Sequence, residues 1–332
     1  MSPPPDAEIA GIRCLPIATP FAVGRVNLYL LEDDPLTLID SGPNSGQALD
    51  ELEQALNGHG HAIEDIGLLV LTHQHMDHIG LAEIIARRSG AEVAALDLVA
   101  PYLERYREDM ELDDRFAARM MLRHGLPADV VHALRAVSAS YRAWGASVTV
   151  TRPLAAGSTL RLRDRTLEVL HRPGHSPSDT VFWDAERRIL LGGDHLIAHI
   201  SSNPLLTRPL GGPAGEEETR PRALVDYIAS LGATREMEID LVLAGHGVPI
   251  RDHASLIDER LRLHDRRAEK ILGLIEAGPA TAYELAQALW GNVAVTQAYL
   301  TLSEVLGHAD LLLGDGRIRE TVADGVVRFA AT

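Results

Sequence analysis

The residues best suited to bind a metal lie in one stretch, LTHQHMDHIG, at positions 71–80. Directly after an apolar run, three histidines and an aspartate fall within six positions: His73, His75, Asp77 and His78. His73 and His75 alternate, so both point to one side of an extended segment, while Asp77 and His78 lie at the expected start of a helix. Imidazole nitrogens and carboxylates suit zinc, and also iron or manganese. The spacing therefore predicts a metal site.

Three later motifs supply further groups of the same kind. They are PGHS, GGDH and AGHG, which contain His175, Asp194 with His195, and His246. Each motif follows a predicted strand that ends in a glycine-bearing loop. Because such loops gather at one edge of a sheet, we expect these side chains to converge near residues 73–78.

These four motifs resemble the metallo-β-lactamase superfamily in order and approximate spacing, over roughly residues 10–250. The resemblance implies an αββα sandwich that holds two divalent metal ions, with zinc expected before iron or manganese. It implies that one ion is held by His73, His75 and His175. The other ion would be held by Asp77, His78 and His246, and Asp194 would bridge the two ions. Asp40, in LIDSG, matches an aspartate of the family that orients the ligands from behind.

Two metal ions would make a nucleophile without serine or cysteine. Cations about 3.5–4 Å apart can share a hydroxide and lower the pKa of water towards about 7. The chain has no GxSxG motif, and Cys14 is far from every matched motif. We therefore expect a hydrolase in which a metal-bridging hydroxide attacks the carbonyl of a small acyl substrate, with Asp77 and Asp194 as catalytic residues. Resemblance to the glyoxalase II and acyl-thioesterase branch places a thioester first, then an ester or lactone.

Other reactions are compatible with the same ligands. The same metals could act on phosphorus in an endoribonuclease or phosphodiesterase, which needs a basic groove. A non-catalytic scaffold is disfavoured because all seven ligand positions are filled. A mononuclear iron dioxygenase typically drops the second-site ligands, but His78 and His246 are present.

Strand-like and helix-like segments alternate through most of the chain, which indicates an α/β fold. The expected strands are residues 12–18, 26–31, 36–39, 66–71, 92–96, 148–151, 160–162, 166–170, 180–183, 188–191 and 241–244. The expected helices are 44–56, 81–88 and 221–231. We predict a catalytic domain at 1–252, with a helical insert at about 99–144.

The remaining residues, 253–332, have the pattern of a small winged-helix domain. A long helix at 254–276 precedes a helix-turn-helix at 281–290 and 293–306. Short strands follow at 311–313, 318–322 and 326–329.

Charge argues against nucleic acid as a partner. The chain has 31 Lys and Arg against 47 Asp and Glu, so its formal charge is 31 − 47 = −16. Residues 254–332 hold eight basic and eleven acidic residues, and 293–306 contain no Arg or Lys. Phosphate binding needs cations at the interface. We expect this domain to serve packing, a homodimer, or a wall of the active-site cleft.

Substrate contacts are expected from two segments. Residues 195–208 follow Asp194 directly, and offer several polar side chains near the metals: His195, His199, Ser202 and Asn203. The helical insert is expected to cap the site and to set substrate size. Tyr102 and Tyr106 are its candidate substrate contacts, although with Met110 they also form a helical stripe whose preferred interpretation is core packing.

A single cysteine, Cys14, excludes an intrachain disulfide and fits a reducing compartment. The start of the chain lacks the features of a signal peptide, and no apolar stretch reaches about 18 residues. We expect a cytoplasmic protein without a membrane span.

Overall fold

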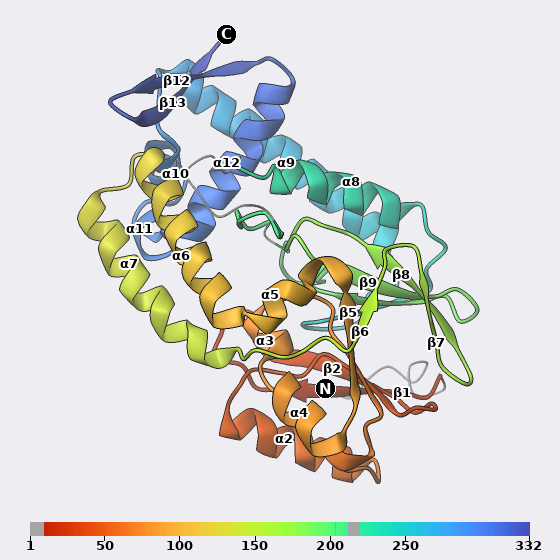
Figure 1. Cartoon of the computed structure of the whole chain (residues 1–332). Coiled ribbons are helices and arrows are strands. Elements are labelled where there is room, and N and C mark those ends of the chain that lie inside the picture. Colours follow the sequence, from red (N-terminus) through yellow and green to blue (C-terminus); the bar gives the residue numbers. More distant parts are fainter. Residues whose placement is uncertain (1–9, 203, 212–219) are drawn as a thin grey trace. The chain divides into compact units, whose positions relative to one another are not determined.

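The computed structural model describes residues 10–202, 204–211 and 220–332, and it divides the chain into two compact units (Figure 1). The first unit comprises Met1–Asp109, Tyr141–Ser202 and Met237–His253. The second comprises Met110–Ser140, Asn203–Glu236 and Ala254–Thr332. No helix among the described residues has the length and apolar character needed to traverse a lipid bilayer.

The first unit is built on two sheets, of which the larger has six strands. In spatial order they are β1 (Ile12–Ile17), β2 (Val26–Leu31), β3 (Thr37–Ile39), β4 (Leu68–Val70), β5 (Glu92–Leu96) and β6 (Arg152–Leu154). The pairs from β1 to β3 are antiparallel, and those from β3 to β6 are parallel. Strands β2, β3 and β4 are buried along their whole length, as expected for strands covered on both faces.

The smaller sheet has five strands, and it contributes three of the predicted motifs. Its spatial order is β11 (Leu241–Ala244), β10 (Ile189–Gly193), β9 (Thr180–Asp184), β8 (Thr166–His171) and β7 (Thr159–Arg161). Only β10 and β11 pair in parallel, so the loops that follow these two strands lie at the same edge.

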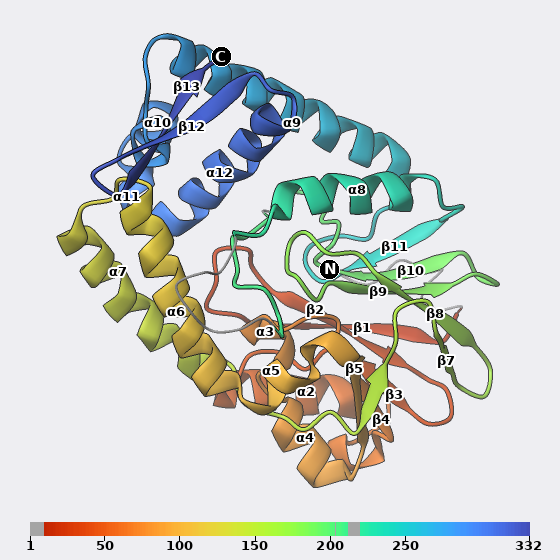
Figure 2. The ribbon, with the colours of Figure 1, turned by 45° about the horizontal axis from the view of Figure 1, so that its top comes forward.

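The two sheets face each other across one apolar core (Figure 2). Val70 and Ala94 of the larger sheet share this core with Phe182, Leu191 and Leu243 of the smaller. Helices α2 (Gly46–Gly58) and α4 (Ala82–Ser89) belong to the same unit. The Ser45 side chain caps α2, and the helix buries one stripe at four-residue spacing: Ala48, Leu52 and Leu56. A short 3-10 turn, η1 (Ile63–Asp65), leads into β4.

The strand predicted at 148–151 is wrong, because β6 begins one residue later, at Arg152. Thr151 meets Val93 through both its backbone and its side chain. Its N–H donates to the Val93 carbonyl at 3.0 Å, and its hydroxyl accepts from the Val93 N–H at 2.8 Å. The hydroxyl takes the place of a backbone acceptor, so the regular ladder starts after Thr151.

Residues 99–144 are helix-rich, as predicted. After the 3-10 turn η2 (Asp97–Val99), they form α5 (Ala100–Glu104), α6 (Tyr106–Arg123), α7 (Ala128–Tyr141) and η3 (Arg142–Trp144). The division between the units cuts through this segment, since Met110–Ser140 groups with the second unit.

The rest of the second unit is helical and ends in a hairpin. Its elements are α8 (Ala223–Arg235), α9 (His253–Glu276), α10 (Ala282–Trp290), α11 (Val293–Thr296), α12 (Ala298–Gly314), β12 (Ile318–Ala323) and β13 (Val326–Ala331). Ile271 of α9, Leu285 of α10, Leu306 of α12 and Phe329 of β13 share a buried core.

Two local predictions in this unit are wrong. The strand expected at 311–313 is the last turn of α12, because a short run of leucines fits a buried helix as well as a strand, and Leu312 faces the core. The helix expected at 293–306 is two helices, since Gln297 leaves the helical region with φ −123° and ψ 40°.

Candidate metal centre

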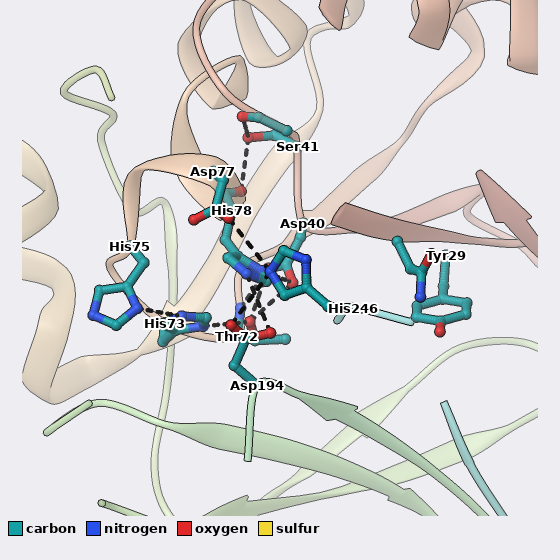
Figure 3. Close-up of polar contacts among 12 residues, drawn as sticks. Tyr29, Asp40, Ser41, Thr72, His73, His75, Asp77, His78, Asp194 and His246 are labelled. Atoms are coloured by element: carbon teal, nitrogen blue, oxygen red, sulfur yellow. Dashed lines mark hydrogen bonds and ion pairs between the residues drawn. The ribbon is translucent and has the colours of Figure 1, made fainter. Parts of the chain in front are cut away.

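The predicted ligands come from the ends of strands in the first unit. His73 and His75 follow β4, and α3 (Met76–Ile79) starts at once, so Asp77 and His78 lie in its first turn. Asp194 follows β10 and His246 follows β11, while His175 lies in the loop between β8 and β9. Figure 3 shows the side chains of His78, Asp194 and His246 meeting between the two sheets, with His73 beside them.

Three imidazoles form the first ligand group. His75 Nδ1 lies 3.0 Å from His73 Nε2 and 2.9 Å from His175 Nε2. Two nitrogens bound to tetrahedral zinc at about 2.0–2.1 Å are about 3.3 Å apart. These three atoms are therefore close to the spacing that one zinc ion needs.

The second group includes Asp77, His78 and His246. His246 Nε2 lies 3.4 Å from Asp77 Oδ2 and 3.4 Å from Asp194 Oδ2, and His78 Nε2 lies 3.4 Å from Asp194 Oδ1. Asp194 Oδ2 also lies 3.6 Å from His175 Nε2 in the first group. The Asp194 carboxylate thus stands between the two groups.

The residues present fit two metal ions. Within the part of the chain that the structure describes, four buried atoms of the seven ligands make no hydrogen bond. One is His175 Nδ1, and the other three are His78 Nε2, His246 Nε2 and Asp194 Oδ1. Buried polar atoms without hydrogen bonds are costly, and the last three face one another across the cluster. Metal coordination would satisfy them, and the nitrogen and carboxylate donors are the types that zinc takes.

Electrostatics favour neutral imidazoles in the first group. Burial, followed by the nearby His78 imidazole, holds the pKa of His73 well below its usual range. Burial, followed by His175, lowers the pKa of His75 to about 3. Both rings therefore keep a lone pair at neutral pH, as metal ligation requires.

The second group has the opposite character. Burial opposes charge on His246, but the carboxylates of Asp194 and Asp77 outweigh it and raise its pKa to about 10. Burial likewise opposes charge on Asp194, but His246 and His78 hold its pKa well below its usual value. The carboxylates thus favour positive charge in this group, which a bound cation would supply in place of protons.

Asp40 lies behind the ligands, where the resemblance placed it. Its Oδ2 accepts from His78 Nδ1 at 2.8 Å, and its Oδ1 accepts from the Thr72 N–H at 2.8 Å. The Thr72 hydroxyl also lies 3.0 Å from His73 Nδ1. Asp40 has φ 63°, a conformation that costs energy for a residue with a side chain. This strained position aims one carboxylate at both ligand groups.

Several residues that support the cluster were not predicted. Tyr29 Oη donates to the Ala244 carbonyl at 2.7 Å, and Asn27 Nδ2 donates to the same carbonyl at 3.0 Å. The Arg25 carbonyl accepts from His246 Nδ1 at 2.9 Å. These bonds join β2 to the end of β11. A signal was available, because Asn27 is a polar residue inside the apolar strand VNLYLL.

The backbone at Gly245 and at Ser41 lies close to the ligands and helps to fix their positions. A Cβ on Gly245 would clash with Asp194 Oδ1 and would lie 2.9 Å from His78 Cε1. On the other side, the Ser41 N–H and hydroxyl both donate to the His78 carbonyl at 2.8 Å and so hold the first turn of α3.

The His175 loop is held by a separate set of polar contacts. Asp179 Oδ1 accepts from the Ser176 hydroxyl at 2.8 Å, and Asp179 Oδ2 accepts from the Ser176 N–H at 3.0 Å. The Ser178 hydroxyl donates to Gln74 Oε1, between the first two histidines of the motif. These contacts tie His175 to the stretch that carries His73 and His75.

The predicted substrate contacts lie in different surroundings. His195 is buried, and burial, followed by Arg172, lowers its pKa to about 3. His199 is exposed, with its ring next to Gly247 and therefore beside the His246 loop. Ser202 is buried, and its hydroxyl makes no hydrogen bond within the described residues. Asn203 lies outside the described residues.

The two tyrosines of the insert are enclosed by protein. Tyr102 is 5% exposed and Tyr106 is 0% exposed, and their rings meet edge to face at 6.3 Å. Tyr106 packs so closely on Gly145 that a Cβ there would clash with its ring.

Fold and site together define a class of protein. Residues 22–246 match the metallo-beta-lactamase superfamily, so the chain belongs to this superfamily. The predicted mixed α/β fold of that superfamily is confirmed.

Individual proteins resemble the chain over almost its whole length. It is 33% identical over 322 residues to the probable metallo-hydrolase YqjP of Bacillus subtilis (strain 168), with 97% of each chain covered. The crystal structure of the metallo-beta-lactamase family protein TTHA1429 from Thermus thermophilus matches with a TM-score of 0.79 and 28% identity. That match covers 97% of this chain and 99% of that chain.

A shorter match involves the atrochrysone carboxyl ACP thioesterase of Aspergillus fumigatus. It is 25% identical over 121 residues, which are 36% of this chain and 25% of the thioesterase.

Proposed function

We propose that this protein is a metal-dependent hydrolase with a dinuclear centre, most simply a zinc centre. One observation carries the proposal: Asp194 reaches both ligand groups, at 3.4 Å from His246 Nε2 and 3.6 Å from His175 Nε2. The similarity to a probable metallo-hydrolase over the whole chain supports the reaction class.

His73, His75 and His175 would hold one ion, and Asp77, His78 and His246 would hold the other. When bound, the two ions supply a Lewis acid for the substrate oxygen and lower the pKa of water between them. The Asp194 carboxylate, which lies between the two ligand groups, would offset the repulsion of two bound cations. Asp40 orients the His78 ring through its hydrogen bond with Nδ1, and so holds Nε2 toward the metal.

We propose a thioester as the substrate, with an ester or lactone as the next choices. The thioesterase match supports this class, although it covers only part of either chain. His199 is exposed beside Gly247, so we propose that it contacts the leaving group or the acyl chain. The helical insert, with Tyr102 and Tyr106, is proposed as a cap that limits substrate size.

A panel of acyl thioesters, esters and lactones tests the reaction. The metal-loaded protein is expected to hydrolyse at least one of them, and His73→Ala is expected to lose that turnover. Activity that survives both His73→Ala and a strong chelator would refute the metal-dependent mechanism.

For residues 253–332 we propose a winged-helix-like domain that packs or dimerises and does not bind nucleic acid. The order of α9, α10, α11 and α12 before the β12–β13 hairpin supports this assignment. Light scattering tests whether the protein forms a homodimer. A monomeric mass at micromolar concentration would contradict the homodimer.

We also propose that the protein is cytoplasmic. Cell fractionation tests this location, and recovery of the protein outside the cytoplasm would exclude it.

A further inference from the structure

A second cluster of potential metal ligands lies in the second unit, in a part of the chain that no sequence motif singled out. It consists of His264 on α9 with Glu304 and His308 on α12. One ligand atom from each residue lies within 4.8 Å of the others. Glu304 and His308 are four residues apart, so they share one face of α12. The cluster therefore joins two helices that lie side by side in both views (Figures 1 and 2).

The two imidazoles have a spacing that suits a metal ion. His264 Nδ1 lies 3.2 Å from His308 Nε2, close to the separation of about 3.3 Å expected between two nitrogens on tetrahedral zinc. His308 Nδ1 donates to the Glu304 backbone carbonyl at 2.7 Å. This bond fixes the ring tautomer, so the lone pair of His308 lies on Nε2 and faces His264. Metal-binding histidines are held in the same way, by a partner on their other nitrogen.

Glu304 supplies the negative charge of the cluster. Arg267 Nη1 donates to Glu304 Oε1 at 3.1 Å, which orients the carboxylate through one of its two oxygens. The side chains of Arg267 and Glu304 are 35% and 19% exposed, while His264 and His308 are buried. The carboxylate of the cluster thus lies nearer the surface than its two imidazoles.

The protonation state of the two rings suits metal binding. His264 Nδ1 faces His308 Nε2, and His264 Nε2 is buried without a hydrogen bond among the described residues, whether Nδ1 donates or binds an ion. Burial, the larger cause for each ring, lowers the pKa of His264 and of His308 to about 4. Both rings are neutral at pH 7, the state in which imidazole binds a metal.

We propose that His264, Glu304 and His308 bind one divalent transition-metal ion, zinc in particular. Two histidines and a glutamate are a known zinc donor set, which water completes to four ligands. Because the ligands come from α9 and α12, the ion would join these helices and stabilise the second unit. The proposal is independent of the proposed hydrolase, since no residue is shared with the strand-end cluster.

Counting zinc in the full-length protein tests the proposal. Wild type, His264→Asn, Glu304→Gln and His308→Asn are dialysed against the same low, buffered free zinc at neutral pH, and bound zinc per chain is measured. Each cluster variant is expected to hold about one ion fewer than wild type. The result is a difference, so it does not depend on how many ions the strand-end cluster holds. Failure of the dinuclear centre would change all four counts together.

His124→Asn is the matched control. His124 is also a buried histidine of the second unit, with its pKa lowered to about 3, mainly by burial, but it is outside the cluster. This variant is expected to keep the wild-type zinc count. If His308→Asn does not fold, Glu304→Gln decides the question, because it keeps the shape of a partly exposed side chain. Equal zinc in wild type and in folded Glu304→Gln and His264→Asn would overturn the proposal.

Discussion

The two histidine clusters of this molecule are built in different ways. The strand-end cluster draws its ligands from loops that follow β4, β8, β10 and β11, and Asp40 holds it from behind. The helical cluster draws on α9 and α12, and backbone and arginine contacts hold it. His75 in the first cluster and His264 in the second are both neutral at pH 7, because burial lowers their pKa. Only the strand-end cluster has carboxylates beside two of its histidines, His78 and His246. The difference suggests chemistry at the first cluster and stabilisation at the second.

The largest expected effect comes from removing the carboxylate between the two ligand groups. Asp194→Ala is expected to lower kcat/KM by about 10³-fold, because metal stabilisation of a transition state is worth several kcal/mol. It should also lose part of the bound metal while far-UV circular dichroism stays unchanged. Glu304→Gln, the corresponding change in the helical cluster, should leave kcat/KM near wild type. Near-wild-type turnover in Asp194→Ala would rule out the role proposed for this carboxylate.

A smaller loss is expected from Asp40→Asn. The variant keeps the size of the side chain but replaces the oxygen that accepts from His78 Nδ1 or the one that accepts from Thr72. Partners behind metal ligands typically contribute about 10–100-fold in affinity or activity. Metal titrations and kcat/KM should both fall within that range. If neither changes, Asp40 has only a role in the turn.

The strand-end cluster could be predicted from the sequence and the helical cluster could not, for a physical reason. His73, His75, Asp77 and His78 lie within six positions, and a chain seldom needs such a set except for a metal. His264 and His308 are 44 residues apart, and only the packing of α9 on α12 makes them neighbours. Contacts of this kind depend on tertiary structure, and single-sequence patterns do not report them.

The same limit explains the local errors in the fold. The strand pattern at 148–151 was cut short because the Thr151 side chain replaces a ladder acceptor, a contact that involves Val93 in a distant segment. The leucines at 311–313 fit either element until the core position of Leu312 is known. In contrast, β2 and β11 were predicted with the bounds that the structure has, because their apolar runs are short and clearly bounded.

The helical cluster should make stability fall in acid. Burial, the larger cause, holds the pKa of His264 and His308 at about 4 in the folded state, against the ordinary 6.5. The unfolded chain therefore binds more protons between pH 6.5 and 4, and the free energy of unfolding falls as the pH falls through this window. Each proton contributes about 1.4 kcal/mol per pH unit. Urea unfolding with a chelator present measures this slope, which should flatten in the double variant His264→Asn, His308→Asn. An unchanged slope would place the acid sensitivity elsewhere.

The smallest expected effect concerns nucleic acid. Residues 254–332 hold eight basic and eleven acidic residues, and neither α11 nor the first part of α12 contains Arg or Lys. Counterion release therefore cannot drive binding to a phosphate backbone. Fluorescence anisotropy with single-stranded RNA at physiological salt should show no binding, and RNA should not be cleaved. Metal-dependent RNA cleavage that His73→Ala abolishes, without any esterase activity, would favour the phosphodiesterase alternative.

The most direct test of the dinuclear centre is a crystal structure of the zinc-loaded protein, with data collected at the zinc absorption edge. Two anomalous peaks are expected in the first unit, one among His73, His75 and His175 and the other among Asp77, His78 and His246. The Asp194 carboxylate should lie between them. A single peak in the first unit, with His78 and His246 free of metal at saturating zinc, would exclude the dinuclear centre.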